Sequence, residues 1–174
     1  MTYDTNIHDY VLRTCTAELR SYNDFQWPSS GPVEAPDWDP KPECGGGLHG
    51  LLYGEGNGSL LNFSTISRWL IVEIEKGSSI SIDDDKVKFP KGNVVAVGDQ
   101  KTITDIMREI YPHAAVVGAT LTGGDGAVMT GGDGAVFIFR AKNKTLVAKV
   151  GENGIEAGKK YAVLNGKIVE VQNG

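Results

Sequence analysis

The stretch Gly118-Ala-Thr-Leu-Thr-Gly-Gly-Asp125 is followed by Gly126-Ala-Val-Met-Thr-Gly-Gly-Asp133 and by the partial unit Gly134-Ala-Val-Phe137. Each full unit is a four-residue stub followed by a Thr-Gly-Gly-Asp corner. A fixed eight-residue period predicts short stacked β-segments with glycine corners, a β-solenoid-like stack. The simpler alternative is a plain meander with four-residue turns. Because a freestanding stack needs about three repeats, this one must lean on its neighbours.

Beyond the repeat, the end of the chain predicts a β-hairpin. Residues 161–164 and 167–171 alternate between apolar and polar positions around Asn165-Gly166, a pair that favours a type I′ turn. Two further strands are expected at 135–140 and 144–150. The carboxy-terminal part, 113–174, is therefore interpreted as a repeat stack followed by hairpins.

Before the repeat, one amphipathic helix is predicted. Apolar residues at 103, 106, 107 and 110 share one helical face. Asp99 or Thr102 can cap its start, and Pro112 lies just past its end.

The amino-terminal part, 1–112, is expected to be a mixed, β-rich region packed as one unit with the repeat. Its strands are predicted at 10–16, 48–53, 69–75, 79–82, 86–89 and 93–97, and the last three suggest an antiparallel meander. Residues 22–47 contain five prolines and two tryptophans, which predicts a long extended loop. The expected fold is α+β and mainly β.

Composition bounds the function. The net charge of −5 disfavours duplex-nucleic-acid binding, because phosphate contacts need a basic face. No run of 18 apolar residues and no signal peptide is visible, so a cytoplasmic protein without a membrane span is expected. Cys15 and Cys44 lie 29 apart without a CxxC motif and are interpreted as free thiols.

The segment Cys44-Gly-Gly-Gly-Leu-His-Gly50 is the densest candidate for a site. His49 in this segment, together with Glu55 and with Arg13 on the first predicted strand, could line a pocket. Cys44 with His49 as base is a conceivable nucleophilic pair. The alternative interpretation is that the glycines shape a tight loop and that His49 is structural.

Metal and nucleotide motifs do not match this sequence. Cys44 and His49 lack zinc spacing, and residues 83–85 are interpreted as a solvated acidic turn. Asp125 and Asp133 repeat every eight residues, whereas calcium β-rolls repeat every nine. We expect no metal and no cofactor.

Motifs spread over the chain resemble a family of uncharacterised bacterial and phage proteins. The residues that carry the resemblance are Arg13-Thr14, Phe25-Gln-Trp-Pro28, Gly31-Pro-Val33, Asp37-Trp38, 44–50, Gly54-Glu-Gly56, Trp69–Glu73 and Lys88-Phe-Pro90. In that family a similar region precedes glycine-alanine-threonine repeats like those of ice-nucleation proteins. A second likeness is to ADP-ribosyltransferase-like folds, and it implies an enzyme pocket built on the first strands.

Three functions remain open. The first is a non-enzymatic interaction protein of phage or mobile-element type that binds or inhibits a host protein. Its contacts are expected on the loop 22–47, through Trp27, Trp38, Asp37, Asp39 and Cys44. The second is a small pocket enzyme with Arg13, His49 and Glu55. The third is a structural protein that self-associates into a homo-oligomer through strand edges.

Overall fold

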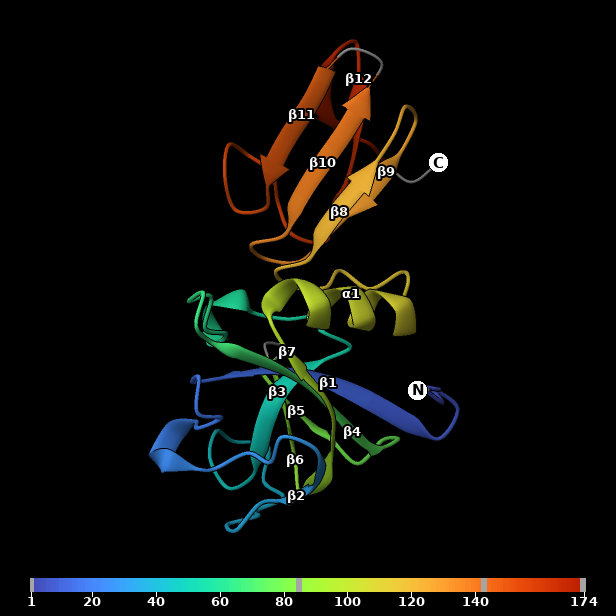
Figure 1. Cartoon of the computed structure of the whole chain (residues 1–174). Coiled ribbons are helices and arrows are strands. Elements are labelled where there is room, and N and C mark those ends of the chain that lie inside the picture. The colour runs from blue at the N-terminus through green and yellow to red at the C-terminus, as the bar shows by residue number, and fades with distance from the viewer. Residues whose placement is uncertain (1, 84–85, 142–143, 173–174) are drawn as a thin grey trace.

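Seven strands of the amino-terminal part pair into one sheet in the computed structural model, which describes residues 2–83, 86–141 and 144–172. The strands are β1 (His8–Cys15), β2 (Gly31–Glu34), β3 (Leu48–Leu52), β4 (Arg68–Glu75), β5 (Ile80–Ile82), β6 (Lys86–Phe89) and β7 (Lys91–Gly98). Their order is β2-β7-β4-β1-β3-β6-β5, and all neighbours are antiparallel (Figure 1).

The predicted meander over β5, β6 and β7 is wrong at its last step. β6 pairs with β3, where Leu48 lies opposite Phe89, so β7 crosses the sheet to lie between β2 and β4. The loop 22–47 also contains β2, which the proline pattern did not predict. This strand carries Pro32 at the sheet edge, where a residue without an N–H is tolerated. Residues 84–85 of the predicted acidic turn lie outside the described residues.

The amino-terminal part of the protein, up to the end of the helix, is called here the body, and the part from Gly118 onwards is called the repeat region. Side chains along the central strands of the body alternate between two buried clusters. Tyr10 and Leu12 of β1 face the helix and the repeat region. Val11 and Cys15 face a second cluster that Trp27, from the long loop, covers. Two 3-10 turns, η1 (Tyr22–Asp24) and η2 (Gly58–Leu60), lie in the connecting segments.

The helix α1 (Gln100–Ile110) confirms the prediction from the apolar periodicity. Asp99 is its N-cap, and its side chain accepts a hydrogen bond from the Thr102 N–H at 2.8 Å. Ile103 and Met107 are fully buried on the face that meets the sheet and the repeat region. Figure 1 shows α1 between the seven-stranded sheet and the strands that follow.

The remaining strands form two three-stranded sheets. One has the order β11-β10-β8 and the other β13-β12-β9. Their bounds are β8 (Thr120–Gly123), β9 (Val128–Thr130), β10 (Val136–Ala141), β11 (Lys144–Lys149), β12 (Lys160–Leu164) and β13 (Lys167–Glu170). The predicted hairpin is confirmed by β12 and β13, and its turn residues Asn165 and Gly166 have φ values of 52° and 73°.

The octapeptide units do not form a meander. β8 and β10 pair in parallel with Leu121 opposite Phe137, a separation of 137 − 121 = 16 residues, or two units. The intervening β9 pairs instead with β12 in the other sheet. Consecutive units therefore alternate between two facing sheets, and the glycine that starts each unit supplies a positive φ at the corner.

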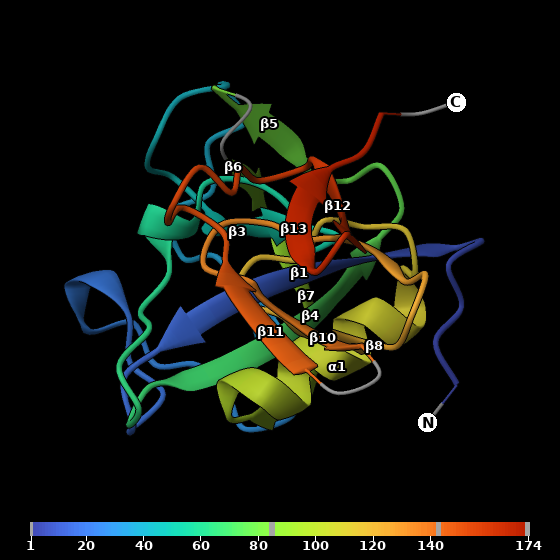
Figure 2. The ribbon, with the colours of Figure 1, turned by 90° about the horizontal axis from the view of Figure 1, so that it is seen from above.

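The repeat region packs against the body, as expected for a stack with fewer than three full repeats. Phe137 belongs to the same buried cluster as Tyr10 and Met107. The Gly58 N–H donates to Asp133 Oδ2 at 2.9 Å, and the Val117 N–H donates to the Gly54 carbonyl. Viewed from above, these strands lie over the helix and the first sheet (Figure 2). No helix in the described ranges is long and apolar enough to cross a membrane.

Candidate functional site

Two adjoining cavities meet at Arg13. The larger, of about 480 Å³, is called here the Arg13 cavity, and its neighbour has about 300 Å³. Four residues line both: Arg13, Tyr22, Gly45 and His49. The Arg13 cavity is also lined by Thr14, Cys44, Gly50, Leu51, Leu60, Leu61 and Lys86. Two of the three residues predicted for an enzyme pocket thus come together.

Arg13 lies on the face of β1 that carries Val11 and Cys15. Its guanidinium carbon sits 4.8 Å from the centre of the Trp27 ring, a cation–π arrangement. Its Nη1 donates to the His49 carbonyl at 2.5 Å, whereas its Nε is enclosed and has no hydrogen-bond partner among the described atoms. Burial lowers the pKa of Arg13, although a guanidinium remains charged in proteins.

His49 lies on β3 directly opposite Lys88 of β6. Burial, followed by the charges of Lys86, Arg13 and Lys88, lowers its pKa to about 4 despite a hydrogen bond with the Gly47 backbone. The imidazole is therefore neutral at pH 7. Its Nε2 is buried and has no hydrogen-bond partner in the described part of the chain.

Lys88 holds the glycine-rich segment in place. It is only 1% exposed, and its Nζ donates to the carbonyls of Glu43 and Gly45 at 3.0 and 3.1 Å. The same Nζ lies 5.8 Å from the centre of the Trp38 ring. These hydrogen bonds attach the glycine-rich segment to β6 beside the cavity.

The two cysteines differ. Cys15 is buried beside Arg13, and burial raises the pKa of its thiol to about 11, which makes it a poor nucleophile. Cys44 is exposed at the cavity, and its Sγ lies 3.1 Å from Lys86 Nζ. Both are free thiols, as predicted.

Glu55 does not join Arg13 and His49. Its Oε1 accepts the Ala115 N–H at 2.6 Å, and it lines a different cavity, of about 320 Å³, with Tyr53 and Tyr111. Its observed contact links the body to the segment that precedes the repeat. The carboxylate of the predicted enzyme pocket is therefore elsewhere.

The contact residues predicted on the long loop do not share one exposed surface. Trp27 is only 1% exposed, so its ring lies in the core and is not available at the surface. Trp38 is partly buried against the same cluster. Asp37 lines the smaller cavity, while Asp39 forms an exposed ion pair with Lys41 at 3.8 Å.

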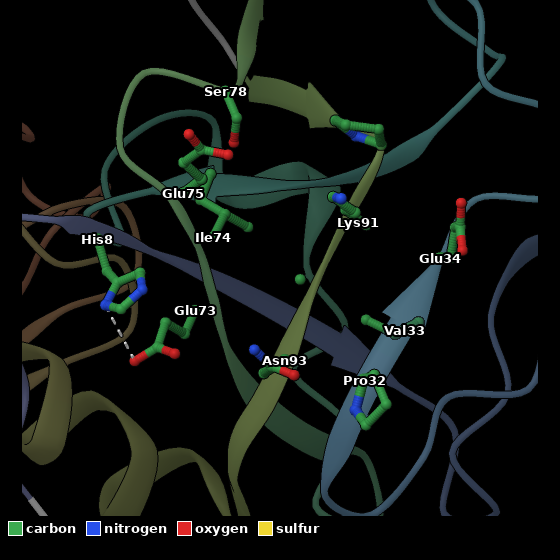
Figure 3. A pocket seen from close by; sticks show the side chains of 12 residues that line it. His8, Pro32, Val33, Glu34, Glu73, Ile74, Glu75, Ser78, Lys91 and Asn93 are labelled. Carbon is green, nitrogen blue, oxygen red and sulfur yellow. Dashed lines mark ion pairs between the residues drawn. The ribbon is translucent and has the colours of Figure 1, made fainter.

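A separate cavity of about 560 Å³ lies among β2, β4 and β7 and is acidic (Figure 3). Glu34, Glu73 and Glu75 line it, and Glu73 Oε2 lies 3.6 Å from His8 Nδ1. The Ser78 hydroxyl is buried there without a hydrogen-bond partner among the described atoms. Within the described ranges, no three His, Cys, Asp or Glu residues are grouped so as to hold a metal ion.

Sequence reasoning missed Tyr22, Lys86 and Lys88 as neighbours of the Arg13 cavity. Both lysines lie on β6. They were missed because the pairing of β6 with β3 was not predicted. The alternating Lys-Val-Lys-Phe pattern was the available signal, because it places Lys86 and Lys88 on one face.

Known proteins match parts of this chain. An ice nucleation protein of Pseudomonas syringae is 37% identical over 91 residues, which is 52% of this chain and 8% of that protein. An ice nucleation protein of Xanthomonas campestris pv. translucens is 31% identical over 103 residues, 59% of this chain and 7% of that protein. The chain thus spans less than a tenth of the length of these relatives. No solved structure matches it. The model of the family described as "Domain of unknown function (DUF7666)" matches residues 10–106, more than half of the chain, which therefore belongs to this family.

Proposed function

We propose that this protein is a non-enzymatic interaction protein that associates with a second copy of itself through one edge of its repeat region. The edge, called here the β8–β9 edge, consists of the unpaired sides of Thr120–Gly123 and Val128–Thr130. The observation that carries the proposal is the contrast in charge between this edge and the opposite one.

The β8–β9 edge carries no charged side chain within its strands. Val128 is 55% exposed, and Thr122 is also exposed. At the other margins of the two sheets, β11 carries Lys144 and Lys149, and β13 carries Lys167 and Glu170. Charged residues, lysine above all, protect edge strands from pairing with other chains. Within the edge strands themselves, one side of the repeat region therefore carries charged residues and the other carries none.

The sixteen-residue register supports the same proposal. β8 and β10 pair two units apart while β9 joins the facing sheet, which is the arrangement expected if two octapeptides make one coil of a β-solenoid-like stack. In such stacks each coil contacts only its neighbours, so the first coil offers a surface shaped for another coil. The ice nucleation proteins that match this chain favour a repeat-based function over catalysis.

The geometry around Arg13 argues against the enzyme alternative. His49 faces cations, no carboxylate lines the Arg13 cavity in the described part of the chain, and Glu55 is engaged elsewhere. A general acid or base works best when its pKa lies near the working pH, and the pKa of His49, about 4, lies well below neutral pH.

Sedimentation velocity over a range of protein concentrations tests the proposal. We expect the sedimentation coefficient of the wild-type protein to rise with concentration and that of Val128→Lys to remain at the monomer value, because a lysine at the open edge opposes strand pairing.

The matched control is Val147→Lys on β11, where the valine is 63% exposed but the strand already carries lysines. This variant should associate like the wild type. A wild-type protein that stays monomeric at every concentration, or equal losses in the two variants, would contradict the proposal.

A further inference from the structure

The Arg13 cavity has a single sign of charge. Among its described lining residues, Arg13 and Lys86 are charged and none is acidic. Lys88 lies next to His49 on the neighbouring strand. None of the ion pairs between described residues includes Arg13, Lys86 or Lys88. The protein has a net charge of −5, so three neighbouring cations without a carboxylate partner among the described residues stand out against its composition.

Two polar atoms of residues that line this cavity have no hydrogen-bond partner among the described atoms. The Nε of Arg13 and the Nε2 of His49 are both buried, and neither has a hydrogen bond to described atoms. Leaving a buried polar atom of a charged group unsatisfied is costly, so such atoms point to a missing partner. The contact of Arg13 with the Trp27 ring and its hydrogen bond to the His49 carbonyl hold the guanidinium at the cavity wall.

Part of the remaining lining is apolar or aromatic. Leu51, Leu60 and Leu61 border the cavity, and Tyr22, which is 85% exposed, stands at both cavities. A volume of about 480 Å³ falls within the usual range of small-molecule sites. An anion with an organic body therefore fits the lining better than a bare inorganic ion.

We infer that the Arg13 cavity binds an organic phosphate monoester, with the phosphate held by Arg13 and Lys86 and the organic body against Tyr22, Leu60 and Leu61. A phosphate offers three strong acceptor oxygens, which suits donors that approach from β1 and from β6. A carboxylate offers only two oxygens and a single negative charge. This site is independent of the β8–β9 edge and remains if the proposed self-association fails.

Calorimetric titration of the full chain tests the inference with three probes. Phenyl phosphate carries both the phosphate and an aromatic ring. Phenol has the ring without the phosphate, and inorganic phosphate has no organic group. We expect phenyl phosphate to bind most tightly and phenol to give no measurable heat.

The informative variant is Lys86→Gln, because Arg13 is packed against Trp27 and its replacement endangers the fold. Loss of a charge-assisted hydrogen bond should weaken phenyl phosphate binding by about tenfold or more. The matched control is Lys91→Gln on β7, at the acidic cavity, which should bind phenyl phosphate like the wild type. No binding of phenyl phosphate at millimolar concentration, binding of phenol as tight as that of phenyl phosphate, or equal weakening by the two variants overturns the inference.

Discussion

The body and the repeat region obtain order in different ways. In the body, β1 and β4 each bury four consecutive residues, so both faces of the sheet are packed. In the repeat region, β8 and β9 alternate buried with exposed residues, and the glycine corners set the register. The body therefore brings distant side chains into cavities, whereas the repeat region presents backbone edges. The proposed ligand site lies in the first arrangement, and the proposed self-association uses the second.

The largest effect is expected where the two regions share their core. Phe137 is fully buried in the cluster that also contains Tyr10 and Met107, so Phe137→Ala should cost about 3–5 kcal/mol of unfolding free energy. All three tryptophans lie in the body, at positions 27, 38 and 69, so their fluorescence reports its unfolding. We expect the denaturation midpoint measured by tryptophan fluorescence to fall in this variant.

The control is Val147→Ala, on the exposed face of β11, which should leave that midpoint unchanged. If Phe137→Ala shifts circular dichroism but not tryptophan fluorescence, the two regions unfold separately and the shared cluster does not couple them.

A smaller effect separates two corners that have the same sequence. Gly124 and Gly132 occupy equivalent positions in consecutive units, yet a Cβ on Gly132 would lie 2.3 Å from the Ala115 carbonyl oxygen. The nearest atom to a Cβ on Gly124 is 4.0 Å away. Gly132→Ala should therefore cost about 1–3 kcal/mol, while Gly124→Ala should lie within about 0.5 kcal/mol of the wild type. Equal midpoints in urea for both variants would show that the second corner does not dock as described.

Local patterns predicted the elements that depend on local chemistry. The helix followed from its apolar period and the Asp99 cap, and the last hairpin from Asn165-Gly166. The strand order could not be predicted from local patterns, because β6 pairs with β3 and β7 pairs with β4, and both pairs are distant in sequence. The same non-local pairing delivers Lys86 and Lys88 to His49. Arg13 and His49 line one cavity, whereas Glu55, although close to His49 in sequence, lines another.

The pH dependence of stability provides a further difference between the body and the repeat region, because His49 lies in the body. The folded-state pKa of His49, about 4, lies below its ordinary value near 6.5 because of burial and of Lys86, Arg13 and Lys88. The unfolded chain thus binds a proton that the folded chain refuses, so stability is lost as pH falls from about 6.5 towards 4. After discounting for solvent screening, the loss should be about 1–2 kcal/mol. In His49→Gln this part of the pH dependence should disappear.

Urea denaturation at several pH values measures this difference. The contributions of other groups that titrate in the same window cancel when the pH dependence of the variant is compared with that of the wild type. Exposed His113, which precedes the repeat region, provides the control as His113→Gln. An identical pH slope for the wild type and His49→Gln would show that the imidazole is not held neutral.

The smallest effect concerns the polar contact between the two regions. Asp133 accepts the Gly58 N–H at 2.9 Å, whereas Asp125, its equivalent one unit earlier, is exposed. Asp133→Ala should cost about 1 kcal/mol, because one charged acceptor of a backbone N–H is lost, and Asp125→Ala should cost less than about 0.5 kcal/mol. Chemical denaturation of both variants measures the difference. If Asp125→Ala is the more destabilising variant, the aspartate at each corner stabilises its own octapeptide unit. The contact of Asp133 with Gly58 would then contribute little to stability. If the predicted order holds, the same Gly-Gly-Asp corner has two uses: exposed in the first unit and a joint to the body in the second.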